Sequence, residues 1–261
     1  MTQLMGVVNV TPDSFSDGGL YLDPEAAVAH GRELAEAGAE ILDVGGESTR
    51  PGAEPVGEAE ELRRVIPVIQ GLVAADCHVS VDTSKAAVAV AALEAGAEIV
   101  NDVTALRGDP EMASLCAERG AGVVLMHMLG EPRTMQEDPR YDDVVADVRA
   151  FLVERLEAAV AAGIDEERIW LDPGIGFGKT AAHNMELLRR LGELRDLGRP
   201  LVIGTSRKSF IGRVDGSPAD RRLGGTIASS VLAAAAGAEV LRVHDVAEVR
   251  QALTVAAAIL G

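Results

Sequence analysis

The sequence predicts a single α/β domain, a (β/α)8 TIM barrel spanning residues 1–261, on three observations. Eight short, β-branched apolar runs alternate with longer segments rich in alanine and glutamate. Aromatic residues make up only 3% of the chain, and Ala, Val, Leu and Ile carry most of its 48% hydrophobic content, as expected where helices cover a buried parallel sheet. Eight units in this length give roughly 33 residues each, close to the usage of eight-unit barrels.

The eight apolar runs are the predicted strands. They cover residues 6–10, 41–44, 79–81, 99–103, 122–126, 169–171, 201–204 and 240–243. The segments between them are long enough for crossover helices, and Asp23 stands directly before a Pro-Glu pair as a helix cap. Gly38, Gly96 and Gly237 stand where a helix should stop and a strand should start, because glycine adopts a left-handed conformation at low cost. An open doubly wound sheet is the alternative, but no GxGxxG follows the first run.

Charge and cysteine usage exclude several classes of function. The formal net charge is -17 at pH 7, which repels polyphosphate backbones and anionic membrane surfaces, so we expect neither a nucleic-acid nor a membrane partner. Cys77 and Cys116 are far apart in sequence and predict neither a disulfide framework nor a zinc site. No apolar stretch is long enough to span a membrane, and the N-terminus lacks the features of a signal peptide. We therefore expect a cytoplasmic protein.

Polar residues follow every predicted strand, and in a parallel barrel these strand ends form one face that carries the chemistry. Strands three, four and six supply Asp82, Asn101 and Asp172, whose acceptors and amide suit a flat heterocycle with several N–H donors. Strands seven and eight supply potential cations, at the usual phosphate seat of this architecture. These are Lys208, Arg242 and His244. The pattern predicts a ligand with a nitrogen-rich ring and a phosphate group.

The sequence is also compatible with purely structural roles for the basic residues after strands seven and eight. Arg242 and His244 could form a buried pair satisfied by Asp245 or Asp102. Residues 206–209 could equally form a solvated basic turn. His127 follows strand five, and we expect a satisfied structural group there rather than a general base.

Several long strings in this order resemble bacterial dihydropteroate synthases, from Met5 almost to the C-terminus. The strings are NVTPDSFSDGG at 9–19, DVGGESTRPG at 43–52, DPGIGFGK at 172–179, SRKS at 206–209 and RVHDV at 242–246. The resemblance implies that hydroxymethyl-dihydropterin pyrophosphate and para-aminobenzoate condense to dihydropteroate, with release of pyrophosphate, in folate biosynthesis. Sulfonamides mimic the second substrate in this family.

The resemblance also implies roles for individual residues. The pterin site comprises Asp82, Asn101, Met126, Asp172 and Lys208. Asn9 is implied as the ligand of a Mg²⁺ ion that also binds pyrophosphate. The pyrophosphate anchors are Thr49, Arg242 and His244. The aminobenzoate pocket comprises Thr11, Pro12, Phe15, Pro51, Phe177 and Ser209. The residues implied in catalysis are Asp13, Arg50 and Lys208.

The chemistry fits an early departure of pyrophosphate, because ring nitrogens spread the positive charge left at the methylene. The site then needs electrostatic stabilisation of the departing anion, and the arylamine needs no general base. The resemblance implies a homodimer through helices late in the barrel, although the Ala-rich stretches 227–236 and 246–260 could instead pack on their own strands. Two alternatives are a pterin-dependent methyltransferase domain and a non-catalytic pterin-binding paralogue. The complete loop strings argue against both.

Overall fold

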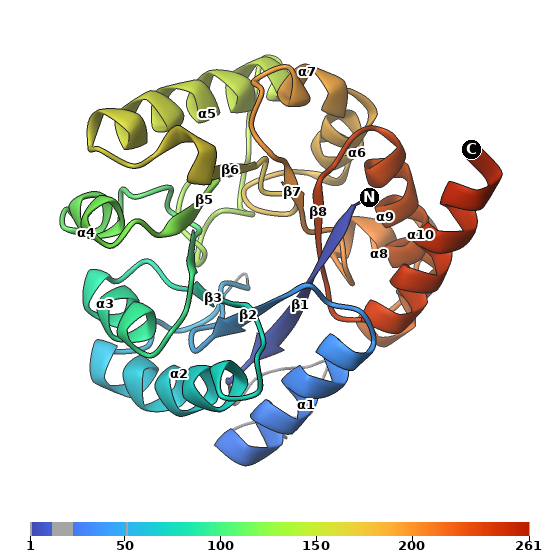
Figure 1. The fold of residues 1–261 in the computed structure, drawn as a ribbon. Coiled ribbons are helices and arrows are strands. Elements are labelled where there is room, and N and C mark those ends of the chain that lie inside the picture. The colour runs from blue at the N-terminus through green and yellow to red at the C-terminus, as the bar shows by residue number, and fades with distance from the viewer. Residues whose placement is uncertain (1, 12–22, 51, 261) are drawn as a thin grey trace.

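Eight parallel strands form the centre of the molecule, and helices surround them (Figure 1). The structure is a computed structural model that describes residues 2–11, 23–50 and 52–260. The strands are β1 (Gln3–Asn9), β2 (Ile41–Gly45), β3 (Val79–Asp82), β4 (Ile99–Asp102), β5 (Gly122–Met126), β6 (Ile169–Asp172), β7 (Val202–Ile203) and β8 (Val240–Val243). The predicted α/β barrel is confirmed.

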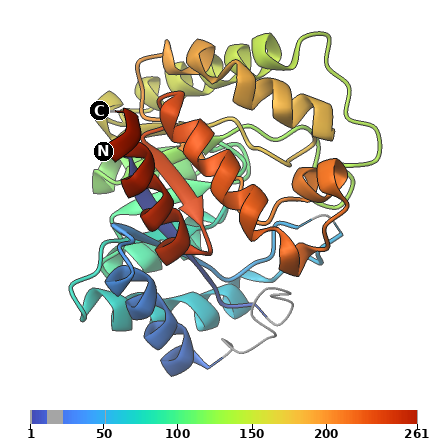
Figure 2. The same ribbon diagram turned by 90° about the vertical axis from the view of Figure 1, so that its right-hand side faces the viewer.

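The helices form an outer ring, with α9 and α10 side by side next to the N-terminal strand (Figures 1 and 2). They are α1 (Pro24–Glu36), α2 (Glu58–Val73), α3 (Ala86–Glu94), α4 (Met112–Arg119), α5 (Val144–Ala161), α6 (Ala181–Arg189), α7 (Leu191–Arg195), α8 (Ser209–Asp215), α9 (Leu223–Ala235) and α10 (Val246–Leu260). Two 3₁₀ turns, η2 (Glu166–Arg168) and η3 (Ala219–Arg221), complete the elements. No helix among the described residues is long and apolar enough to cross a membrane.

The sheet runs β6-β5-β4-β3-β2-β1-β8-β7, and a single parallel bridge between Leu171 and Leu201 joins its two ends. The predicted strand limits agree within about one residue, except at β1 and β7. β1 starts at Gln3, three residues before its prediction, because its backbone pairs with β8 from Gln3 onward. β7 keeps only two of the four predicted residues, Val202 and Ile203, which pair with β8.

The predicted helix signals are also found. Asp23 accepts a hydrogen bond from the Glu25 backbone and caps α1. Gly38, Gly96 and Gly237 have φ angles of 106°, 104° and 100°, in the left-handed region that glycine tolerates best. Each therefore turns the chain from a helix into the following strand.

The barrel interior is built in layers. Its lower layer is apolar and packs inward-facing residues of seven strands against one another: Met5, Ile41, Ile99, Val124, Trp170, Val202 and Val240. Side chains two positions apart along a strand point to the same side. The next inward positions, toward the strand ends, therefore lie above this layer. In β2, β4, β6 and β8 these positions are Asp43, Asn101, Asp172 and Arg242. The apolar layer thus forms the base of a polar cavity.

Candidate active site

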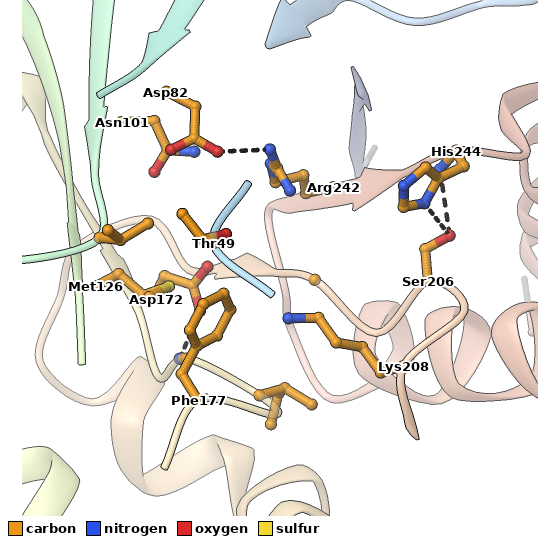
Figure 3. Close-up of a pocket in the computed structure, with 14 residues that line it drawn as sticks. Thr49, Asp82, Asn101, Met126, Asp172, Phe177, Ser206, Lys208, Arg242 and His244 are labelled. Atoms are coloured by element: carbon orange, nitrogen blue, oxygen red, sulfur yellow. Dashed lines mark hydrogen bonds and ion pairs between the residues drawn. The ribbon is translucent and has the colours of Figure 1, made fainter. Parts of the chain in front are cut away.

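One pocket opens at the carboxyl ends of the strands, above the apolar layer (Figure 3). Side chains from seven strand-end segments point into it, including acids, an amide and cations. The lining residues are Thr49, Asp82, Asn101, Val103, Met126, Asp172, Gly174, Ile175, Phe177, Gly204, Ser206, Lys208, Arg242 and His244. Asp172 and Arg242 therefore share one cavity.

Arg242 connects two carboxylates at the floor of this pocket. Its Nε donates to Asp43 Oδ2 over 2.6 Å, and its Nη2 donates to Asp82 Oδ2 over 2.8 Å. The same Asp43 oxygen accepts from Asn101 Nδ2 over 3.0 Å. Burial disfavours a charged guanidinium, but Asp43 and Asp82 outweigh this effect and raise the pKa of Arg242. Arg242 thus pairs with Asp43 and Asp82 and not with Asp245 or Asp102, so the pairing considered from the sequence is wrong.

The two acids of the pterin prediction lie in a strongly desolvated environment. Burial raises the pKa of Asp82 to about 7, with Arg242 opposing and the Asp43 charge assisting the shift. Burial also raises the pKa of Asp172, although the Gly174 N–H, which donates to Asp172 Oδ1 over 2.6 Å, opposes the shift. Both carboxylates are therefore poorly solvated acceptors, and a ligand that donates N–H groups to them replaces lost hydration.

Lys208 enters the pocket from the segment after β7. Its Nζ lies 4.0 Å from the centre of the Phe177 ring, a cation–π arrangement that Figure 3 shows from the side. Burial lowers the pKa of Lys208 to about 8, with the Arg242 charge assisting and Asp172 opposing. The lysine therefore points into the pocket, so a solvated basic turn does not describe its position.

His244 contributes a neutral imidazole to the rim. Its Nδ1 lies 2.9 Å from Ser206 Oγ, which also accepts from the His244 backbone N–H. Burial lowers the pKa of His244 below its ordinary value, and the charges of Arg207 and Arg242 lower it further. The Arg207 side chain in turn donates to both carboxylate oxygens of Asp245. The strand-seven and strand-eight segments are thus fixed to each other at the rim.

Comparison with known proteins supports the resemblance seen in the strings. Residues 5–244 match the pterin binding enzyme family. Dihydropteroate synthase of Escherichia coli is 48% identical over 259 residues, which is 99% of this chain and 92% of that protein. The chain belongs to the dihydropteroate synthase family.

Solved structures of dihydropteroate synthases have the same fold. The Yersinia pestis enzyme in a sulfonamide complex gives a TM-score of 0.96 at 46% identity and covers 99% of this chain and 94% of that one. The Xanthomonas albilineans enzyme in complex with 7,8-dihydropteroate gives 0.89 at 50% identity, with 100% and 94% covered. Those complexes hold a sulfonamide drug and 7,8-dihydropteroate, each on a relative that shares this barrel.

The pocket brings together most of the site residues that the resemblance implied for a dihydropteroate synthase. Nine of them line it: Thr49, Asp82, Asn101, Met126, Asp172, Phe177, Lys208, Arg242 and His244. Four others do not belong to the lining: Asn9 ends β1 half-buried, Thr11 is buried, Arg50 is half-buried and Ser209 is exposed at the start of α8. Pro12, Asp13, Phe15 and Pro51 lie outside the described residues.

Sequence reasoning assigned no role to two residues at this site. Asp43 is fully buried and joins Arg242 to Asn101, and it stands two positions after the inward-facing Ile41. That spacing was a usable signal, because it places Asp43 directly above the apolar layer. Lys179 is 2% exposed and lies behind the pocket wall, where Nζ approaches His127 Nδ1 at 2.8 Å. Its burial could not be read from the sequence.

His127 is a satisfied structural group, as expected. It is 5% exposed, contacts Lys179 and packs edge-on against Phe151 with ring centres 4.8 Å apart. Burial lowers the pKa of His127 to about 3, and the Lys179 charge assists. The residue is therefore a neutral imidazole at neutral pH.

The described residues contain no group of three or more His, Cys, Asp or Glu that could hold a metal ion. Asn9 offers one neutral amide oxygen at the end of β1. Mg²⁺ is commonly held through one or two protein oxygens together with substrate phosphates and water. The donor set therefore fits a magnesium ion bound mainly through a diphosphate substrate, and it does not fit a cage of protein ligands.

Proposed function

We propose that this chain condenses hydroxymethyl-dihydropterin pyrophosphate with para-aminobenzoate to give dihydropteroate and pyrophosphate. The observation that carries the proposal is a single pocket lined by two acids and an amide together with Lys208, Arg242 and His244. A pterin presents several N–H donors on one edge, and a diphosphate presents oxygen acceptors. The arrangement of charges thus supports a substrate that carries both groups.

The floor supports a bound pterin through complementary hydrogen bonds. Asp172 and Asp82 offer carboxylate oxygens to the guanidine-like edge of the ring, while Asn101 offers an amide. Lys208 donates to ring acceptors from the opposite side. Met126 supplies an apolar, polarisable surface on which the flat ring packs. These roles stay proposals for each residue.

The residues from strands two and eight support the diphosphate. Arg242 uses Nε and Nη2 on Asp43 and Asp82, and a guanidinium carries five N–H donors, so three stay available for phosphate oxygens. We propose Thr49 and His244 as further donors, the imidazole being neutral with Nδ1 facing Ser206. Asn9 would hold the magnesium ion, which when bound neutralises the departing pyrophosphate.

Substitution at the pterin methylene then proceeds with early loss of pyrophosphate. The C–O bond breaks with its electron pair going to the leaving group, and the arylamine nitrogen forms the new C–N bond before its proton leaves to solvent. Arg242 stabilises the departing anion. We propose Asp13 as the counter-charge of the cationic intermediate and Arg50 as a catalytic side chain of the second loop.

The second substrate is proposed to bind beside Phe177. The other residues proposed for this pocket are Thr11, Pro12, Phe15, Pro51 and Ser209. Closure of the first two loops would exclude water and complete this pocket after the pterin substrate has bound. A cytoplasmic homodimer also stays a prediction. It is supported by exposed apolar side chains of α9 and α10, notably Leu232 and Ile259.

A two-product assay tests the proposal. The purified protein is given both substrates, with and without magnesium, and pyrophosphate and dihydropteroate are measured together. Equal amounts of the two products, dependent on magnesium, are expected. Pyrophosphate without dihydropteroate would mean hydrolysis, and binding of the pterin substrate without release of either product would mean a binding protein. Aminobenzoate should bind only when pyrophosphate and magnesium are present, and tight binding to the protein alone would contradict the ordered sequence.

A further inference from the structure

Lysine is used very sparingly in this chain. Of 24 basic side chains only three are lysines, Lys85, Lys179 and Lys208, and each follows a strand at the mouth of the barrel. Arginine supplies the positive charge elsewhere. Lys208 lines the pocket, and Lys85 is paired with Glu47 and Glu61. Lys179 is the third, and the reaction as described gives it no part.

Lys179 holds the loop between β6 and α6 against the end of β5. Its ammonium donates to the carbonyl oxygens of Gly174 over 2.9 Å and of Phe177 over 3.0 Å. It also lies 2.8 Å from His127 Nδ1 and 3.3 Å from the His127 carbonyl oxygen. The side chain is 2% exposed, so these contacts replace its hydration. One buried ammonium thus joins three points of the pocket wall.

The loop that Lys179 holds is tightly seated. A β-carbon added at Gly174 would lie 1.9 Å from the His127 carbonyl oxygen, and one added at Gly178 would lie 2.4 Å from the Leu129 carbonyl oxygen. Both glycines have left-handed φ angles, 67° and 60°. The path of the loop therefore depends on close backbone contact with the segment after β5, and Lys179 is the polar link across that contact.

We propose that Lys179 is a positioning residue, acting through this loop to place Phe177 against Lys208 and so to form one wall of the aminobenzoate pocket. This rests on the proposed function. Lysine suits the position because its ammonium directs three donors to acceptors that lie in different directions, whereas the arginine fork is planar. Burial also lowers the pKa of Lys179 to about 7, as expected for an ammonium with no carboxylate in hydrogen-bond contact.

Asp172 does not depend on the lysine in the same way. It ends β6 within the sheet, in register with Met126, and its carbonyl oxygen accepts from the His127 N–H over 2.9 Å. Phe177 lies five residues further along the loop, beyond the sheet. Loss of the ammonium should therefore displace Phe177 while Asp172 stays in place. The two substrates should respond differently.

The test is Lys179→Met, which keeps an unbranched chain out to the ε position and removes the ammonium with its donors. The expected result is an increase of about ten- to hundredfold in KM for aminobenzoate, with unchanged affinity for the pterin substrate. The matched control is Arg155→Met, which removes a half-buried cation that donates to the Ala105 carbonyl and does not line the pocket. That variant should lose stability without any substrate-selective change. Equal losses for both substrates, or none, in folded Lys179→Met would overturn the proposal.

A second readout does not need activity. Because the chain has only three lysines, selective isotope labelling of lysine gives an NMR spectrum with few signals. The ring current of Phe177 should change the chemical shifts of the Lys208 methylene protons. Phe177→Ala should abolish this shift, and Lys179→Met should reduce it. If the protein forms no dihydropteroate but the Lys208 signal responds in this way, the proposed function fails and the positioning role stands. An active protein whose Lys208 signal ignores Lys179→Met refutes the positioning role alone.

A pair of His127 variants covers the case in which Lys179→Met does not fold. Asn at position 127 carries an acceptor close to the position of Nδ1, whereas Leu carries none. His127→Leu should raise the KM for aminobenzoate, and His127→Asn should restore most of the loss. Equal KM values in the two variants would count against the proposal.

Discussion

Arg242 Nε lies 2.6 Å from Asp43 Oδ2, and this pair connects the last strand of the barrel to the second across 199 positions of sequence. Asp43 is fully buried, and its Oδ1 has no hydrogen-bond partner within the described part of the chain. A buried carboxylate of this kind is stable only with a cation beside it. Arg242 therefore stabilises the floor of the site as well as presenting donors to the pocket.

Removal of the Arg242 cation should lower the stability of the folded protein. Arg242→Met is expected to lower the free energy of unfolding by about 3 kcal/mol, because the Asp43 charge stays buried without compensation. Urea denaturation at pH 7.5 measures the effect. The double variant Asp43→Asn with Arg242→Met should recover part of the loss, since no charge then remains. A single variant as stable as the unmodified protein would show that Asp43 is not ionised.

Asp172 and Lys208 should contribute to binding of the pterin substrate. Asp172→Asn is expected to weaken binding of the pterin substrate by about ten- to hundredfold, because an acceptor becomes a donor facing the N–H groups of the ring. Lys208→Ala should weaken it as well. Calorimetric titration with the pterin substrate measures both. Tight binding by Asp172→Asn would remove this residue from the pterin site.

Asp13 is predicted to act after binding. Asp13→Ala should leave the affinity for the pterin substrate intact and lower kcat, because only the cationic intermediate would face this carboxylate. Single-turnover measurements with saturating aminobenzoate separate the two effects. Unchanged turnover would exclude Asp13 from the mechanism.

The dependence of kcat/KM on pH follows from two shifted groups. Burial raises the pKa of Asp82 to about 7, so the carboxylate is lost as the pH falls below that value. Burial lowers the pKa of Lys208 to about 8, so its charge is lost as the pH rises above that value. Activity toward the pterin substrate should therefore peak between them. Asp82→Asn should remove the acidic limb, and Lys208→Arg should move the alkaline limb upward. A kcat/KM that stays constant from about pH 6 to about pH 9 would contradict the assignment of Asp82 to the acidic limb and of Lys208 to the alkaline limb.

Acid stability should depend on His127. Burial lowers its pKa from 6.5 to about 3, so between these values the unfolded chain takes up a proton that the folded chain does not. Stability is therefore lost as the pH falls below about 6.5. Asp82 has the opposite effect, because its raised pKa lets the folded state bind the extra proton as the pH falls below 7. A variant at position 127 isolates the histidine contribution.

His127→Asn should lose less stability than the unmodified protein between pH 7.5 and 4.5, by about 2 to 3 kcal/mol. Urea unfolding at both pH values measures this difference, and the comparison at pH 7.5 controls for packing changes. An identical loss in both proteins would show that His127 is protonated in the folded state.

Much of the site could be predicted because strand ends are recognisable in the sequence. Asp82, Asn101 and Asp172 each lie on or directly after a predicted strand, and parallel strands bring their carboxyl ends to one face. Asp43 was missed although it stands two residues after Ile41, the same spacing that separates Asn101 from Ile99. The partners of Arg242 could not be predicted, since Asp43, Asp82, Asp102 and Asp245 were all charge-compatible in sequence.

The sequence by itself determined the number of strands, their order along the chain, and which acidic, amide and basic side chains follow them at the barrel mouth. These features could be predicted because hydrophobic periodicity and glycine positions are local properties of the chain. Only the tertiary structure decided which acid accepts from Arg242, that His244 pairs with Ser206 and that Lys179 is buried behind the pocket wall. These outcomes depend on distances of a few ångströms between segments that are remote in the chain. Packing sets such distances, and the competition for buried hydrogen bonds then selects one partner from several of equal charge.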